Sequence, residues 1–240
     1  MGSIWRTSRD PGLDPQTQIK KIKNEVNVMK LSVLVPVYNE RQWVEECIDR
    51  VTAQRVEGVK ALEVILVNDG STDGTDQVLD RIRKKHPEVV KVIQHEKNQG
   101  KGACIRSAVA AMSGDICVIQ DADLEYSPAN YPVLLGPLVE GVADCVYGSR
   151  FQGDQPKRVL LFWHYLGNKF LTFLSNMCNN INITDMETGY KAFRCDVLKK
   201  ITIVSSRFGV EPEITAKVAR LNCRMYEVGV SYFGRTYAEG

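Results

Sequence analysis

Short apolar runs alternate with amphipathic segments along most of the chain. The apolar runs lie at 31–37, 62–67, 89–94, 116–120 and 143–148, and each is short enough to be a strand buried on both faces. Between them, apolar positions recur with helical spacing, as from Arg41 to Gln54, and further helices are expected to end near Lys85, Met112 and Glu140. Strand–helix units in series predict right-handed crossovers and a mostly parallel central sheet flanked by helices, which is an α/β fold.

The pattern changes after Arg150. The segment from Arg158 to Asn179 is predicted to be a helix that is apolar over much of its surface, but Lys169 interrupts it, so it is not expected to span a bilayer. It is either part of the core or an interfacial helix with Trp163 and Lys169 at headgroup level. The remaining chain predicts a loop and short strand at 184–194, a helix at 212–221 and a strand at 224–230.

Residues 1–28 are interpreted as an N-terminal extension, and residues 29–240 as one domain. Ile19, Ile22, Val26 and Met29 have helical spacing, which predicts a short helix before the first strand. The extension has no apolar signal-peptide core, so no signal peptide is expected. The domain is long enough for a sizeable core.

Composition narrows the chemistry only slightly. A net charge of +2 gives no argument for a nucleic-acid partner. The seven cysteines are an odd number, widely spaced and often within apolar runs, which predicts reduced, mostly buried thiols and not a disulfide framework or a zinc site. The three scattered histidines predict no histidine-based metal cluster.

The strongest chemical signal follows the apolar run 116–120. Along an extended segment, Asp121, Asp123 and Glu125 would point the same way, at the carboxyl end of a strand. Converged carboxylates repel one another unless a cation lies among them, and hard oxygen ligands suit Mg²⁺ or Mn²⁺. This stretch therefore predicts a site for a metal and a nucleotide diphosphate, with a solvated acidic loop as the alternative.

Two more strand ends carry polar clusters, at residues 38–40 and 68–69. Because the strand ends of a parallel sheet form one crevice, three such clusters favour a binding site over unrelated surface loops. A Gly-x-Gly-x-x-Gly turn is absent after the first strand, and Pro36 and Tyr38 take its place, which favours a nucleotide base packed beside Tyr38. The Gly100-Lys101-Gly102 motif lacks the other residues of a P-loop and is interpreted as a helix start.

Five motifs together resemble the family 2 glycosyltransferases of the GT-A fold. The likeness is greatest to dolichyl- or polyprenyl-phosphate mannose synthases and their polyprenyl-phosphate glucosyltransferase relatives, and it covers about residues 29–240. The motifs occur in the family's order and separations: Pro36-Val-Tyr-Asn-Glu40, Asn68-Asp-Gly-Ser71, Asp121-Ala-Asp123, Gly148-Ser-Arg150 and Gly234-Arg235.

The resemblance implies a donor site and a metal site. Asp123 would bind the metal, Mg²⁺ or Mn²⁺, together with Glu125, at a position where the synthases often carry Gln. Arg235 would contact the donor phosphates, and the chain ends at Gly240, about where the family has a further phosphate-binding lysine, so a functional segment is expected to follow. The nucleotide sugar would be bound by Pro36, Tyr38, Glu40, Val67, Asp69, Asp121, Ala122, Asp123 and Arg235.

The implied acceptor is a polyprenyl phosphate, whose phosphate would meet Arg150. Arg158 and Lys191 are further candidates for this contact. A monoalkyl phosphate has a second pKa of about 6, so it is largely dianionic at neutral pH and needs no general base. The expected catalytic residues are Asp123, Arg150 and Arg235.

The expected reaction is the inverting, metal-dependent transfer of mannose or glucose from GDP-mannose or UDP-glucose to polyprenyl or dolichyl phosphate, by a peripheral enzyme on the cytoplasmic face of a membrane. One alternative is a family 2 enzyme with a sugar-hydroxyl acceptor, which needs a carboxylate base such as Glu187, Glu211 or Glu213. Alternatives of other classes are a sugar nucleotidyltransferase and a non-catalytic partner subunit.

Overall fold

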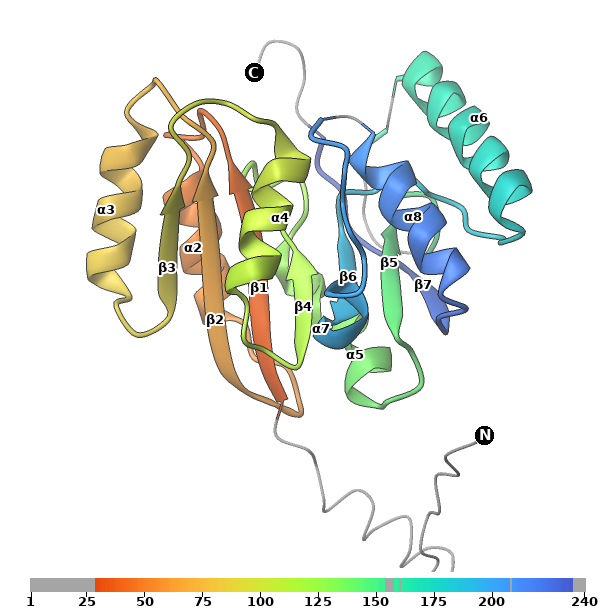
Figure 1. The fold of residues 1–240 in the computed structure, drawn as a ribbon, viewed down its shortest axis with the longest axis horizontal. Helices are drawn as coiled ribbons and strands as arrows, with labels where there is room; N and C mark the ends of the chain where they lie inside the picture. The colour runs from red at the N-terminus through yellow and green to blue at the C-terminus, as the bar shows by residue number, and fades with distance from the viewer. Residues whose placement is uncertain (1–28, 154–157, 160, 208, 235–240) are drawn as a thin grey trace, which may run out of the picture.

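A seven-stranded sheet forms the centre of the computed structural model, which describes residues 29–153, 158–159, 161–207 and 209–234. Its strands lie in the order β3-β2-β1-β4-β6-β5-β7 (Figure 1). All pairings are parallel except those of β6, which runs antiparallel to both neighbours. The strands are β1 (Met29–Val37), β2 (Val59–Asn68), β3 (Val90–Gln94), β4 (Ile116–Ile119), β5 (Cys145–Ser149), β6 (Lys191–Arg194) and β7 (Met225–Gly229).

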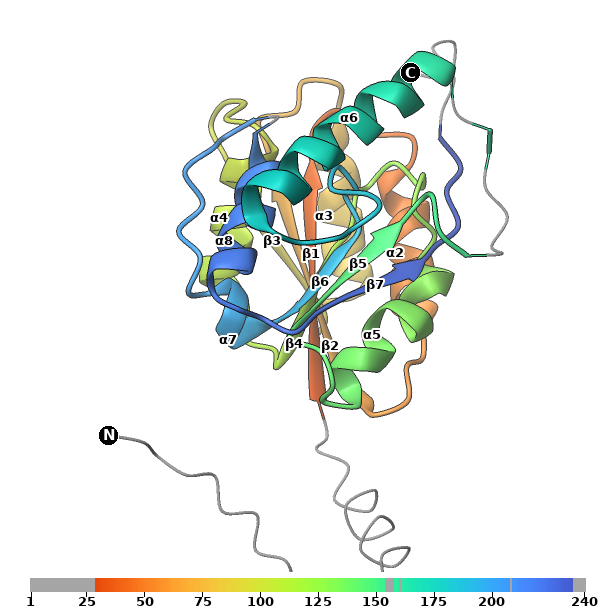
Figure 2. The same ribbon diagram turned by 90° about the vertical axis from the view of Figure 1, so that its right-hand side faces the viewer.

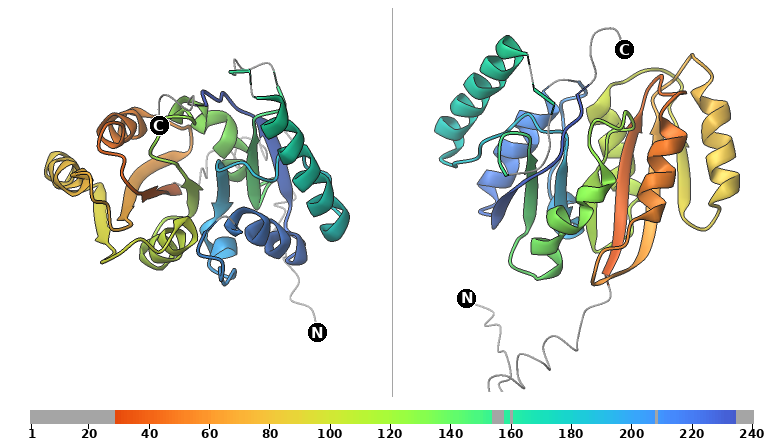
Figure 3. Two further views of the ribbon diagram at one scale, coloured as in Figure 1. Left: turned by 90° about the horizontal axis from the view of Figure 1, so that it is seen from above. Right: turned by 180° about the vertical axis from the view of Figure 1, so that it is seen from behind.

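Helices cover both faces of this sheet, which confirms the predicted α/β architecture (Figure 3). One core lies beneath α2 (Val44–Ala53), α3 (Thr75–Lys85) and α5 (Tyr131–Val139), with the short 3₁₀ helix η1 (Pro128–Asn130) leading into α5. The other core lies beneath α4 (Lys101–Ala111), α7 (Cys195–Leu198) and α8 (Val210–Arg220). Successive residues of the central strands point alternately into the two cores, which is why these strands are continuous apolar runs.

The helix α6 (Phe162–Asn179) lies outside this three-layer body, where it packs against α8 (Figure 2). Thr172 is the one residue of α6 that is buried. Phe162 and Trp163 are 66% and 75% exposed, so the alternative that placed this helix in the core is wrong. No helix in the described part of the chain is long and apolar enough to cross a membrane.

The cysteines agree with the prediction of reduced thiols. All seven are free, and five of them are buried. Cys178 is exposed and Cys223 is half-buried. The helix predicted before Met29 lies outside the described residues.

Candidate active site

The three polar clusters meet at the upper edge of the sheet in Figure 1, where β1, β2 and β4 end. The loops after β1 and β2 are bonded to each other: Asn39 accepts from the Thr72 amide at 2.9 Å, and the Asn39 amide donates to the Ser71 hydroxyl at 3.0 Å. Asn39 has a φ of 56°, a left-handed conformation that asparagine tolerates. Tyr38, which precedes this turn, is 47% exposed.

Asp121 lies in an ion-paired network that the sequence did not reveal. Lys101, the first residue of α4, places its Nζ 2.8 Å from Asp121 and 3.2 Å from Glu211. Burial alone would lower the pKa of Lys101, but the two carboxylates outweigh it and raise that pKa above its ordinary value. A Cβ at residue 189 would overlap the Asp121 carboxylate, so a larger residue there would displace the Asp121 side chain. Lys101 is therefore a cation paired with two carboxylates near the end of β4, and not only a helix start.

From the sequence, Asp123 and Glu125 were expected to lie along an extended strand. The structure places them on a turn instead. β4 ends at Ile119, and Leu124 adopts a φ of 63°. The Glu125 amide donates to Asp123 Oδ1 at 3.0 Å, and the hydroxyl of Tyr232 donates to Glu125 Oε2 at 2.8 Å. The two carboxylates thus lie on one braced turn, and their hard oxygens are the donors that Mg²⁺ and Mn²⁺ prefer.

Asp69 is buried, and its own chain occupies both carboxylate oxygens. They accept hydrogen bonds from the Gln99 and Gly100 amides, and Oδ1 lies 2.8 Å from His95 Nδ1. Burial would raise the pKa of Asp69, but these bonds lower it below its usual value. This geometry does not support the predicted direct contact with a nucleoside; instead Asp69 holds the loop before α4. Val67 is also fully buried, and Ala122 nearly so.

The structure brings His95 and Cys104 beside Asp69, a grouping that the scattered histidines did not predict. His95 Nε2 lies 2.8 Å from the Ser107 hydroxyl, so both ring nitrogens have partners within the fold. Burial raises the pKa of the Cys104 thiol to about 12, which keeps it protonated at neutral pH. In this structure the cluster therefore forms a hydrogen-bond network that links Asp69 and His95 to Ser107 and to the loop before α4.

A cavity of about 620 Å³ lies beside Tyr232. Among the described residues, three cations line it: Arg150, Arg158 and Lys169. The Nζ of Lys169 donates to the Thr184 carbonyl at 3.1 Å and lies 4.4 Å from the centre of the Phe151 ring. The remaining walls are the apolar or aromatic side chains of Phe151, Val159, Phe162, Tyr165 and Tyr232. A cavity lined by both cations and apolar side chains fits an amphiphile that carries a phosphate.

Arg150 is held in this cavity by Asp185, which is fully buried. Its Nε and Nη2 both lie 2.8 Å from the Asp185 carboxylate, and its backbone amide also donates to Asp185, at 2.9 Å. Burial would lower the pKa of Arg150, but Asp185 raises it well above its ordinary value. The guanidinium has five N–H donors, so a bidentate pair with Asp185 fixes its orientation without using all of them.

Lys191 is buried, although it was expected from the sequence to be a candidate for the acceptor contact. Its side chain is 1% exposed because β6 lies between β4 and β5, and its Nζ donates to the carbonyls of Met186 and Thr188. Burial lowers the pKa of Lys191 to about 8. An ammonium enclosed in this way is not among the residues that line the cavity at Arg150, so this geometry does not support its predicted contact with an acceptor. Arg235 lies outside the described residues.

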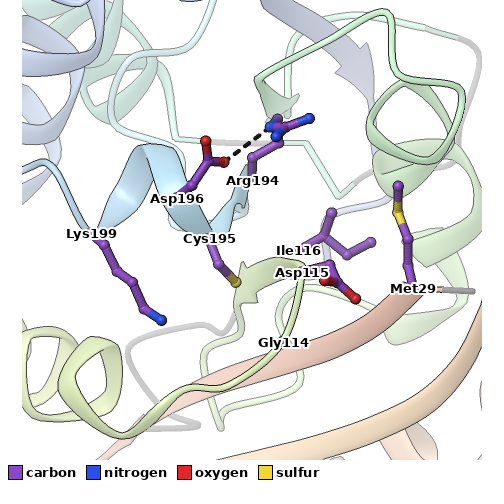
Figure 4. Close-up of a pocket in the computed structure, with 8 residues that line it drawn as sticks. All are labelled: Met29, Gly114, Asp115, Ile116, Arg194, Cys195, Asp196 and Lys199. Carbon is purple, nitrogen blue, oxygen red and sulfur yellow. Dashed lines mark hydrogen bonds and ion pairs between the residues drawn. The ribbon is translucent and has the colours of Figure 1, made fainter. Parts of the chain in front are cut away.

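A second cavity, of about 470 Å³, lies at the opposite edge of the sheet. Figure 4 shows the residues that line it, which include Asp115 and Ile116, just before and at the start of β4, and Asp196 and Lys199, in and just after α7 (Cys195–Leu198). Ligands of open α/β sheets bind outside the carboxyl ends of the strands. This cavity lies at the amino ends of β1 and β4, so it is not the candidate active site.

Solved structures with the same architecture place the fold among the GT-A glycosyltransferases. The glucosyl-3-phosphoglycerate synthase of Mycobacterium tuberculosis, in complex with Mn²⁺, UDP-glucose and phosphoglyceric acid, is similar with a TM-score of 0.68 and 22% identity over 97% of this chain and 80% of that one. A mannosyltransferase from Pyrobaculum calidifontis in complex with GDP-Man and Mn²⁺ has a TM-score of 0.63 and 21% identity, over 88% of this chain and 59% of that one.

The chain belongs to glycosyl transferase family 2, whose sequence model matches residues 32–202. It is 29% identical to the dolichol-phosphate mannosyltransferase of Pyrococcus furiosus over 79% of this chain, and 28% identical to the undecaprenyl-phosphate mannosyltransferase of Micrococcus luteus over 88%. The aligned part is 53% of the Pyrococcus protein and 86% of the Micrococcus one. It is also 24% identical, over 92% of this chain, to a dodecaprenyl-phosphate galacturonate synthase of Rhizobium johnstonii, of which it covers 65%.

Proposed function

We propose that the protein transfers a hexose from a nucleotide-diphosphate sugar to a polyprenyl phosphate, with inversion at the anomeric carbon. The observation that carries this proposal is the cavity at Arg150, where cations and apolar walls meet beside the braced turn of Asp123 and Glu125. The names of the relatives, which are dolichol- and undecaprenyl-phosphate mannosyltransferases, support it. The test is transfer of radiolabelled mannose from GDP-mannose, or glucose from UDP-glucose, into an organic-extractable lipid.

The donor lies in the crevice at the ends of β1 and β4 in this proposal. Tyr38 stacks on the base, with Pro36 and Glu40 beside it. Lys101, whose Nζ pairs with Asp121, is a cation for the oxygens of the donor. Asp123 and Glu125 hold Mg²⁺ or Mn²⁺, which supplies positive charge to the diphosphate leaving group. Arg235 belongs to the same proposal as a further cation for the donor phosphates.

The acceptor phosphate lies against Arg150 in this proposal, with Arg158 and Lys169 as further cations. Because Asp185 fixes the Arg150 guanidinium, the phosphate is oriented in line with the sugar–phosphate bond that breaks. A dianionic phosphate oxygen attacks the anomeric carbon directly, so no proton has to be removed. A single displacement of this kind inverts the anomeric configuration.

Glu187 provides the sharpest test between this acceptor and a sugar hydroxyl. Burial raises the pKa of Glu187, as in many general bases, whereas hydrogen bonds hold the pKa of Glu213 at about 2 despite its burial. If the acceptor is a phosphate, Glu187→Gln is expected to keep the rate within about tenfold, whereas loss of a general base costs about 10²–10⁴-fold. Steady-state assays compare Glu187→Gln with Glu140→Gln, at an exposed residue. A loss of a hundredfold or more in Glu187→Gln alone would favour the hydroxyl acceptor.

We further propose that α6 lies on the surface of the membrane that holds the acceptor lipid. The helix contains no acidic residue, and its apolar side chains are exposed beside the mouth of the acceptor cavity. This arrangement is typical of an interfacial helix, with Trp163 and Lys169 at headgroup level. A location at the cytoplasmic face is part of the same proposal.

Replacing Trp163, Phe170 and Phe173 of α6 with serine is expected to weaken vesicle binding at least about a hundredfold, because each large apolar side chain buried in lipid contributes about 1.5–3 kcal/mol. Flotation with vesicles of mixed neutral and anionic phospholipids measures this binding. The control replaces Val133, Val204 and Leu221, which are exposed elsewhere, with serine. Equal flotation of the two variants, or none by the wild type, would contradict the proposal.

A further inference from the structure

One short segment, Tyr232–Gly234, contacts both halves of the candidate site. On the donor side, the Tyr232 hydroxyl donates to Glu125 Oε2 at 2.8 Å, and the Phe233 amide donates to the Glu125 carbonyl at 3.0 Å. Tyr232 also forms a β-bridge with Tyr126, and the two rings lie 5.1 Å apart. The segment is therefore fixed to the turn that carries the proposed metal ligands.

The same segment forms part of the acceptor side. The Tyr232 ring lines the cavity, and its centre lies 5.4 Å from the Arg150 guanidinium carbon, within range of a cation–π interaction. The Arg158 amide donates to the Tyr232 carbonyl at 2.9 Å, and the Arg158 guanidinium donates to the Gly234 carbonyl at 2.9 Å. Arg150 and Arg158, which line the cavity, thus both contact residues 232–234.

We propose that Tyr232 is a positioning residue that couples the two substrate sites, so that metal and nucleotide at Glu125 strengthen the binding of a prenyl phosphate at Arg150. This inference rests on the proposed function. If Glu125 shifts to ligate a cation, the Tyr232 hydroxyl follows it or loses its bond. The ring then changes its contact with Arg150, which Asp185 holds in place. The two ligands therefore have different affinities in the two arrangements of Tyr232.

Such coupling is reciprocal, because a ligand that strengthens the binding of another is strengthened by it to the same extent. Typical couplings between sites change affinity about 5–150-fold. The expected result for the wild type is therefore that farnesyl phosphate lowers the Kd of Mn²⁺–UDP or Mn²⁺–GDP at least about fivefold, and that the nucleotide lowers the Kd of farnesyl phosphate by the same factor.

The test is calorimetry with these probes on the wild type and on Tyr232→Phe. This variant removes only the hydroxyl that bonds Glu125, and the ring beside Arg150 and the backbone bonds remain. The matched control is Tyr226→Phe, at a half-exposed tyrosine on β7. In Tyr232→Phe, the coupling factor is expected to fall to about one while each probe alone still binds. Tyr226→Phe is expected to keep the wild-type factor.

A wild-type coupling factor that survives in Tyr232→Phe would overturn the proposal for Tyr232 and leave the proposed function intact. A wild type that binds both probes without coupling would also overturn it. A structural role alone would weaken both probes and lower the melting temperature without changing the factor, which again counts against coupling. Failure of the wild type to bind farnesyl phosphate and to move labelled sugar into lipid would instead contradict the proposed function, and the coupling with it.

Discussion

Asp123→Asn is expected to reduce sugar transfer about a thousandfold or more while the protein stays folded. The substitution keeps an oxygen that can accept from the Glu125 amide, so the turn is preserved, but it removes the charge that would bind the cation. A bound metal contributes several kcal/mol of charge stabilisation at the leaving group, and each 1.36 kcal/mol changes the rate tenfold. Asp123→Ala, which also removes the hydrogen bond, is expected to abolish transfer.

Three measurements check this prediction: the transfer rate, the melting temperature and the binding of Mn²⁺ in the presence of UDP or GDP. The control is Asp196→Asn, at an exposed acid on the opposite edge of the sheet. Asp196→Asn is expected to keep both activity and metal binding. Unchanged activity in Asp123→Asn, or full wild-type activity in excess EDTA, would remove the metal from the proposal.

The sequence predicted the fold well because strand and helix periodicity are local properties. Each predicted strand is present within two or three residues of its expected ends, since buried parallel strands form continuous apolar runs. The helix expected from Arg41 begins later, at Val44, after a turn in which the Arg41 amide donates to Asp73 on the neighbouring loop. Such a contact between loops has no signature in the local pattern.

The candidate site was predicted less completely, because its partners come from distant parts of the chain. The position of Lys101 beside Asp121 depends on α4 and β4 meeting at one edge, which no spacing along the chain encodes. Lys191 was a further candidate for the acceptor phosphate, but it lies on an antiparallel strand in the middle of the sheet and is buried there. Asp69 does follow β2 as predicted, yet the loop before α4 closes over it.

The position of Arg150 was predictable from the sequence, but its partner was not. Its position after β5 was predicted correctly, and the sequence analysis assigned it to the acceptor phosphate. The partner that holds it, Asp185, lies 35 residues further on, in the loop between α6 and β6. That loop is itself held by Glu227, which accepts from the Thr184 and Asp185 amides. The Arg150 guanidinium can therefore pair with the buried Asp185 and still have N–H donors for a phosphate.

Arg150→Lys is expected to raise the KM for polyprenyl phosphate and lower kcat, with a loss of about a hundredfold in kcat/KM. Lysine keeps a cation beside the buried Asp185, which avoids the roughly 3–5 kcal/mol cost of leaving that carboxylate unpaired, but it has no planar fork. It therefore cannot pair with Asp185 through two parallel bonds and also orient a phosphate. A misplacement of about 1 Å at a reacting group is enough to cost about a hundredfold in rate.

The deciding experiment is steady-state kinetics with each substrate varied in turn, beside calorimetry of the Mn²⁺–nucleotide complex. The affinity for the nucleotide is expected to change little in Arg150→Lys, because the proposed donor contacts come from Tyr38, Asp123 and Glu125. The control is Arg224→Lys, since Arg224 forms a comparable bidentate pair with Asp144 at the far edge of the sheet, and it is expected to keep wild-type kinetics. A loss of nucleotide affinity with the acceptor KM unchanged would place Arg150 on the donor, and the cavity beside it would then no longer support a lipid-phosphate acceptor.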